Sequence, residues 1–126
     1  MKKCLGTHLL VDAWDCPGDL LDDPELVAQA VKDAIRAGDV TLINMSVHQF
    51  SPQGVTATAT LAESHIALHT WPEHGYLALD IFFCGNKDPR PAIGPIRRTF
   101  RVGRIEVRKL RRGIQVETPE LVEEKL

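Results

Sequence analysis

Few cysteines occur in this sequence of 126 residues, and their spacing gives no sign of a disulfide framework or a metal centre. They are odd in number, and no two form the CxxC pair of structural zinc sites and redox dithiols. We therefore expect free thiols and no metal in a reducing compartment, of which the cytoplasm is the simplest. The cysteines are Cys4, Cys16 and Cys84.

Long apolar runs, repeats and low-complexity segments are also missing. No stretch is apolar for long enough to cross a membrane, and residues 1–6 lack the apolar run of a secretory signal. A hydrophobic content of 44% and a charged content of 25% are ordinary for a globular protein. The sequence therefore predicts a single domain over residues 1–126 with no membrane partner.

Excess charge of one sign is absent as well, because the formal net charge is −2. Basic residues gather in 97–112, but they are not interleaved with the row of aromatic side chains that stacked bases require. We interpret the run as the solvated faces of a helix and a strand, and we expect no nucleic-acid partner.

Periodicity and stop signals predict the order β-α-β-β-β-β-α-β. A capping Asp23, Pro24 at the first helical position and Gly38 at the end delimit the first helix, whereas 15–23 is expected to be a polar loop and the C-terminal end polar and frayed. Short turns between neighbouring strands favour an α+β two-layer sandwich, a mainly antiparallel sheet with helices packed on one face. The strands are expected at 8–14, 43–48, 55–61, 65–71, 76–84 and 104–110, and the helices at 24–37 and 91–101.

The segment after the third strand contains the groups needed for covalent chemistry. That strand alternates alanines with the hydroxyl residues Thr56, Thr58 and Thr60, and it leads directly into Glu63-Ser64. On a strained turn, the Ser64 hydroxyl could attack the Glu63 carbonyl and convert the peptide bond to an ester. Elimination of the Glu63 carboxylate and loss of ammonia would then leave a pyruvoyl group, an electron sink that replaces pyridoxal phosphate.

Three further side chains could serve this chemistry. His69 is suited to be the base for elimination because its ordinary pKa lies near neutrality, and a threonine hydroxyl could stabilise the oxyanion. Cys84 could donate a proton to the decarboxylated substrate. The residues alone leave open plainer interpretations, in which Ser64 is a turn residue, His69 a half-buried strand residue and Cys84 a small core residue.

A family resemblance covers the chain from about residue 5 to residue 112. Its core is Glu63-Ser64-His65, His69 to Glu73, Gly75-Tyr76, Asp80 and Cys84-Gly85, and it extends to residues 5–10 and 48–55. These segments resemble the short, pyruvoyl-dependent prokaryotic S-adenosylmethionine decarboxylase proenzymes, which supply aminopropyl groups for spermidine synthesis.

The resemblance implies cleavage between Glu63 and Ser64 into a 1–63 β chain and a 64–126 α chain. It implies that Ser64 becomes the pyruvoyl group and Schiff-base former, that His69 is the processing base and that Cys84 is the catalytic proton donor. Thr56 stands where the family often has a serine that assists processing. The family also implies an α/β sandwich and a homodimer with sites near the subunit interface, without pyridoxal phosphate or metal.

Substrate contacts are a separate expectation. Phe50 and Trp71 could stack on an adenine, and Glu73 could bind ribose hydroxyls or attract a sulfonium, although core packing is the alternative for the two aromatic residues. Phe83 stands where a smaller threonine is expected, and it would change the pocket if it faced the substrate.

Three alternatives remain at this point. The same fold and cofactor could serve an arginine or ornithine decarboxylase, differing only in pocket residues. A non-catalytic paralogue that activates a partner is less favoured because Ser64, His69 and Cys84 are all present. A metal site would have to use His65, His69, His74 and Cys84, whose spacing lacks a close ligand pair.

Overall fold

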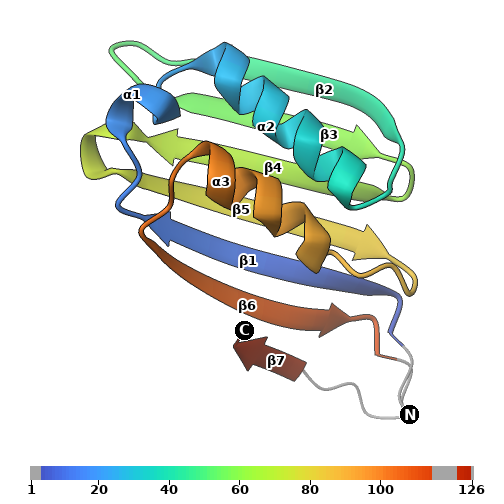
Figure 1. Cartoon of the computed structure of the whole chain (residues 1–126). Coiled ribbons are helices and arrows are strands. Elements are labelled where there is room, and N and C mark those ends of the chain that lie inside the picture. Colours follow the sequence, from blue (N-terminus) through green and yellow to red (C-terminus); the bar gives the residue numbers. More distant parts are fainter. Residues whose placement is uncertain (1–3, 115–121, 126) are drawn as a thin grey trace.

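The computed structural model describes residues 4–114 and 122–125 as one antiparallel sheet with helices on one side (Figure 1). The strand order across the sheet is β2-β3-β4-β5-β1-β6-β7. The strands are β1 (Gly6–Trp14), β2 (Leu42–Gln49), β3 (Val55–Leu61), β4 (Ser64–Trp71), β5 (Tyr76–Cys84), β6 (Arg104–Arg112) and β7 (Val122–Lys125). The helices are α1 (Gly18–Leu21), α2 (Pro24–Ala37) and α3 (Ile93–Thr99), with short 3₁₀ turns at Pro72–His74 and Arg90–Ala92.

Helix α2 forms where its capping signals predict it. The Asp23 carboxylate accepts hydrogen bonds from the backbone N–H groups of Glu25 and Leu26, both at 3.1 Å, and Pro24 needs no such partner. The helix ends before Gly38, where a Cβ atom would lie 2.8 Å from the Phe83 ring. Its apolar stripe is buried against the sheet and consists of Val27, Ala30, Val31, Ala34 and Ile35.

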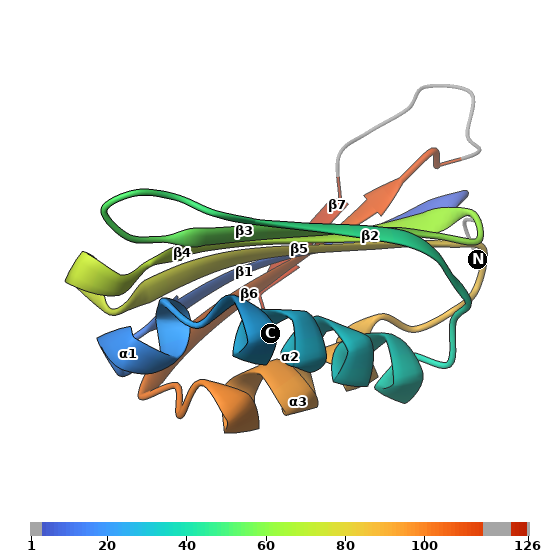
Figure 2. The same ribbon diagram turned by 90° about the horizontal axis from the view of Figure 1, so that it is seen from above.

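Strict alternation along the central strands separates two faces of the sheet. Residues on one face are buried beneath the helices, as Leu9 and Val11 of β1 illustrate. We call the opposite side the open face, since the helices all gather on the other side of the sheet (Figure 2). The open face carries His8, Leu10 and Asp12 of β1, the three threonines of β3, His65, Ala67 and His69 of β4, and Ala78, Asp80 and Phe82 of β5.

The two-layer sandwich, its six predicted strands and its two predicted helices are confirmed, whereas the bounds of the second helix and two predictions about flanking segments are wrong. The segment 15–23, predicted to be a loop, contains α1. Pro17 and Gly18 are typical of loops, so this short helix could not be recognised in the sequence. The second helix is the shorter α3, preceded by a 3₁₀ turn, because prolines break its beginning. The C-terminal end includes β7, where Glu124 pairs with Arg111 of β6 at 2.9 Å.

The rest of the prediction of a frayed C-terminal end falls on residues 115–121 and 126, which lie outside the described residues. Within the described part of the chain, no helix has both the length and the apolar character that a membrane span needs.

Candidate active site

A strained two-residue turn precedes Ser64. β3 pairs with β4 up to Leu61 opposite Ser64, so that Ala62 and Glu63 alone connect the strands. The turn is held from the side by a 3.0 Å hydrogen bond from the Ala62 N–H to the Thr41 carbonyl. Glu63 has a φ of 60°, in the left-handed region, which costs a residue with a Cβ atom about 1–2 kcal/mol. Such strain is often part of the mechanism where it occurs at a functional site.

The Ser64 hydroxyl lies against the backbone of Cys84. Its Oγ accepts a hydrogen bond from the Cys84 N–H at 3.2 Å, beyond the last paired residues of β4 and β5. This contact fixes the position of the Ser64 Oγ atom, and the hydroxyl proton remains available for transfer to a base. Ser64 and Cys84 therefore lie together at one end of the sheet, and both are half-buried.

Replacing Glu63 tests whether the strain contributes to self-cleavage. Glu63→Gly should slow cleavage about fivefold or more. Glycine adopts the left-handed conformation without strain, so the variant lacks the strain of about 1–2 kcal/mol that cleavage releases in the wild-type chain. Glu63→Ala is the matched control, since it removes the carboxylate and keeps the strain, and it should cleave near the wild-type rate. Timed denaturing gels of freshly folded protein measure both rates. A fast glycine variant with a slow alanine variant would assign the effect to the carboxylate instead.

His69 lies far from Ser64 along the same strand. His69 follows Ser64 by five positions on β4, which at the usual rise per residue amounts to about 16 Å. Alternation places His69 on the open face, whereas Ser64 has the parity of the buried Ile66. One chain therefore does not bring the proposed base to the proposed nucleophile.

The neighbour of His69 is Thr56, directly opposite it on β3. The Thr56 Oγ1 and His69 Nδ1 atoms are 3.0 Å apart, within hydrogen-bond distance. This contact orients the imidazole and leaves its Nε2 atom available for proton transfer. The hydroxyl that the sequence assigns to assist processing therefore contacts the assigned base.

The same end of the sheet contains a pocket of about 360 Å³. Phe50 and Trp71 are 49% and 40% exposed, so the alternative that they pack in the core is wrong. The volume and the mixture of aromatic and polar walls are typical of small-molecule sites. The pocket is lined by Phe50, Gln53, Gly54, Thr56, His69, Thr70, Trp71 and Glu73.

Sequence reasoning missed three of these lining residues, Gln53, Gly54 and Thr70. All three belong to segments that carry the family resemblance, but no role in the site was predicted for any of them. Their signal was indirect, since the turn joins the strand bearing the hydroxyl face.

Phe83 does not contribute to the pocket. It is 0% exposed and packs on the helix-covered side of β5, at the end of α2. The expectation that it could shape the substrate site is wrong, because alternation directs Phe83 and Cys84 to opposite faces.

Two acid–base pairs occupy the open face between these two ends. His8 Nε2 lies 3.3 Å from Asp80 Oδ1, and burial lowers the pKa of His8 in spite of that carboxylate. The Tyr76 hydroxyl donates to Asp12, and burial, followed by this contact, raises the pKa of Tyr76 to about 12. Neutral imidazole and neutral phenol are therefore the forms present near pH 7.

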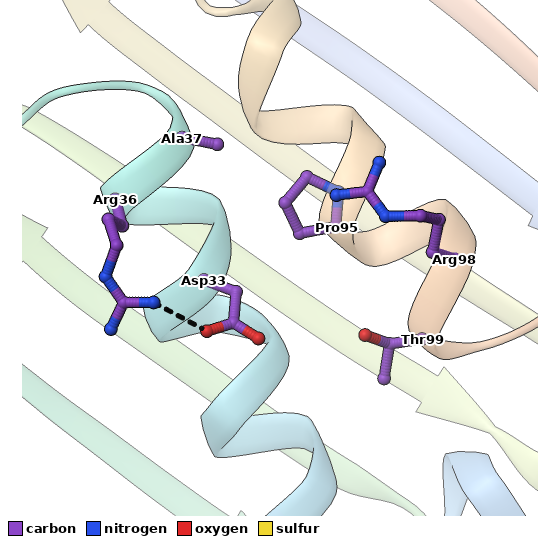
Figure 3. Close-up of a pocket in the computed structure, with 6 residues that line it drawn as sticks. All are labelled: Asp33, Arg36, Ala37, Pro95, Arg98 and Thr99. Carbon is purple, nitrogen blue, oxygen red and sulfur yellow. Dashed lines mark hydrogen bonds and ion pairs between the residues drawn. The ribbon is translucent and has the colours of Figure 1, made fainter.

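Neither a metal site nor a second pocket, between α2 and α3, competes with this region in the part of the chain that the structure describes. Among the described residues, no group of three or more His, Cys, Asp or Glu side chains could hold a metal ion. A pocket of about 430 Å³ lies between α2 and α3, where Asp33 pairs with Arg36 at 3.2 Å (Figure 3). Its lining residues come from the two helices alone and include none of the predicted site residues.

Comparisons with known proteins identify the family to which this fold and sequence are similar. Residues 7–113 match the family model described as S-adenosylmethionine decarboxylase. An S-adenosylmethionine decarboxylase proenzyme from Methanococcus aeolicus is 46% identical over 91% of this chain and 99% of the relative, and one from Acidithiobacillus ferrooxidans is 37% identical over 88% and 84%. The crystal structure of the adenosylmethionine decarboxylase from Aquifex aeolicus superposes with a TM-score of 0.84 at 33% identity, covering 94% of this chain and 98% of that chain.

The fold, the Ser64 turn and these matches define an α+β protein of the pyruvoyl-dependent decarboxylase type. The chain belongs to the S-adenosylmethionine decarboxylase family.

Proposed function

We propose that this chain is a proenzyme that cleaves itself between Glu63 and Ser64 and then decarboxylates S-adenosylmethionine. The observation that carries the proposal is the left-handed Glu63 placed directly before a serine whose Oγ is fixed by the Cys84 N–H. Cleavage would give a 1–63 β chain and a 64–126 α chain.

Cleavage follows from the chemistry of these two residues. Ser64 Oγ attacks the Glu63 carbonyl carbon, the C–N bond breaks, and the released nitrogen takes a proton as an ester replaces the amide. A base then removes the Ser64 Cα proton, and the Glu63 carboxylate leaves. Tautomerisation, addition of water and loss of ammonia leave a pyruvoyl group at the new N-terminus.

The residues present fit this group. Ser64 begins β4 after a strained turn, so cleavage frees the end of the strand and releases the strain. A pyruvoyl group at this position supplies an electron sink for the bond to the leaving carboxylate once the substrate amine has condensed with it. Pyridoxal phosphate and metal are not needed for this function.

The separation of Ser64 from His69 requires a second copy of the chain. The open face carries half-buried and exposed side chains and could pack against the same face of a partner. A two-fold axis running across the strands would reverse the partner's β4 and bring its His69 end over the Ser64 end of the first. In this homodimer, each site combines Ser64 and Cys84 of one protomer with Thr56 and His69 of the other.

Substrate recognition follows from the pocket. Phe50 and Trp71 offer exposed aromatic surfaces on which an adenine can stack, and Glu73 supplies a carboxylate for ribose hydroxyls or a sulfonium. Arginine and ornithine have no ring to stack there, so the pocket favours S-adenosylmethionine over both.

Comparing substrates tests this choice. Release of labelled CO₂ should be at least 100-fold faster, as kcat/KM, from S-adenosylmethionine than from arginine or ornithine, since the stacked adenine and the hydrogen bonds from the ribose to the Glu73 carboxylate together contribute about 3 kcal/mol. A preference for either amino acid would contradict the substrate assignment and leave the cleavage chemistry intact. No CO₂ from any of the three would favour the non-catalytic paralogue.

Cys84 is expected to act only after cleavage. Cys84→Ala should still cleave, because the Ser64 contact uses the Cys84 backbone N–H. Its kcat should fall by about 100-fold or more, the usual contribution of a positioned general acid. Steady-state CO₂ release and the mass of the product measure this loss. Normal turnover would exclude Cys84 as the proton donor.

Cys16→Ala is the control. The Cys16 thiol is buried in the core, and burial raises its pKa to about 11, so this variant should turn over like wild type.

A further inference from the structure

One wall of the pocket belongs to the connection between β2 and β3. Phe50, Gln53 and Gly54 come from this connection, whereas Trp71 and Glu73 come from the other side. The Phe50 N–H donates to the Gly54 carbonyl at 2.8 Å, which closes the connection into a tight loop. Gly54 has a φ of 107°, a conformation that needs glycine. We call residues 50–54 the wall loop.

Asp22, at the end of α1, holds this loop from outside. Its Oδ1 accepts a hydrogen bond from the Gly54 N–H at 2.9 Å, and its carbonyl accepts one from Gln49 Nε2 at 3.0 Å. Gln49, directly before the wall loop, and Gly54, its last residue, are thus both bound to Asp22, which lies 32 positions from Gly54 in the sequence. A hydrogen bond to an ionised acceptor is among the stronger kinds.

Thr70 fixes the same segment to the opposite side of the pocket. Its hydroxyl donates to the Leu21 carbonyl at 2.8 Å and accepts from the Val55 N–H at 2.9 Å, and the residue is only 6% exposed. Thr70 lies between His69 and Trp71 in β4. The Leu21-Asp22 segment therefore holds both the wall loop and the strand that carries the rest of the pocket.

We infer that Asp22 is a positioning residue for substrate binding. It lines no part of the pocket, but its carboxylate fixes the wall loop that presents the Phe50 side chain. Without that contact, the wall loop would populate several conformations, and Phe50 would offer a stacking surface in only some of them. The affinity for the substrate is then reduced in proportion to the population of the competent conformation. Asp22 contacts neither Ser64 nor His69 in any hydrogen bond that the described residues show, so self-cleavage should not depend on it.

The inference rests on the proposed function, and its test separates the two. Asp22→Ala should raise KM for S-adenosylmethionine about tenfold, with kcat within twofold of wild type and an unchanged rate of self-cleavage. Asp22→Asn retains an oxygen acceptor and should restore KM to near the wild-type value. Asp19→Ala removes an exposed carboxylate from the same short helix and is the matched control.

Amide hydrogen exchange gives a readout that does not require enzymatic activity. In Asp22→Ala, exchange of residues 50–55 should speed up relative to Asp19→Ala, while exchange in β1 and β5 stays unchanged. A tenfold change of KM in Asp19→Ala, a loss of kcat without a change of KM in Asp22→Ala, or unchanged exchange of the wall loop would overturn the inference. If the wild-type protein released no CO₂ from S-adenosylmethionine, the proposed function would fail, and the exchange result would still decide whether Asp22 holds the loop.

Discussion

The Ser64→Ala variant remains a single uncut chain and releases no CO₂ from S-adenosylmethionine. Alanine has no oxygen to attack the Glu63 carbonyl, and without that step no pyruvoyl group forms. The expected loss is complete, because the nucleophile and the later electron sink are the same residue. Denaturing gels and CO₂ release from one preparation measure both consequences.

Removing a hydroxyl group far from Ser64 should affect neither cleavage nor CO₂ release. Thr99 lies on α3 in the helical layer, and Thr99→Ala should cleave and turn over like wild type. The alanine substitution at Ser64 should also leave the fold intact, since Ser64 is half-buried at a strand end. Cleavage of Ser64→Ala at the same peptide bond would show that Ser64 is not the nucleophile.

Two inactive variants, Ser64→Ala and His69→Ala, should recover activity when they are produced together. A mixed dimer pairs the intact Ser64 of one chain with the intact His69 of the other and so contains one complete site. If the chains associate at random, half of the dimers are mixed, and about a quarter of all sites are complete. CO₂ release per mole of protein, with each variant alone as reference, measures the recovery.

The pairing of Ser64→Ala with Cys84→Ala is the matched control. Ser64 and Cys84 belong to the same protomer in each proposed site, as their 3.2 Å contact indicates. No mixed dimer of these two variants contains a complete site, so activity should not recover. Recovery in the control, or none with His69→Ala, would contradict a site shared between two protomers.

Local patterns were enough to predict most of the sheet. Alternation is a property of neighbouring residues, and it predicts the strand at 8–14, in which Leu9 and Val11 lie on one face and His8 and Asp12 on the other. The same rule already implied that Phe83 and Cys84 point to opposite sides of β5, although the sequence interpretation left open whether Phe83 faces the substrate.

Long-range contacts could not be predicted in this way. The hydrogen bond from Gly54 to Asp22 joins residues 32 positions apart, and no local pattern indicates it. Likewise, β7 forms beside β6, where Glu124 meets the basic side chains of that strand. In the candidate site, the chemistry of Ser64 and His69 was expected from their types, but the distance between them became clear only with both on one extended strand.

The central claim is that the peptide bond between Glu63 and Ser64 breaks and that Ser64 becomes the electron sink. Intact mass spectrometry of the denatured protein tests it most directly. We predict two chains, residues 1–63 with a free carboxylate and residues 64–126 lighter by one ammonia than a chain beginning with serine. An intact chain of 126 residues after long incubation, or a second chain that still begins with serine, would contradict the account.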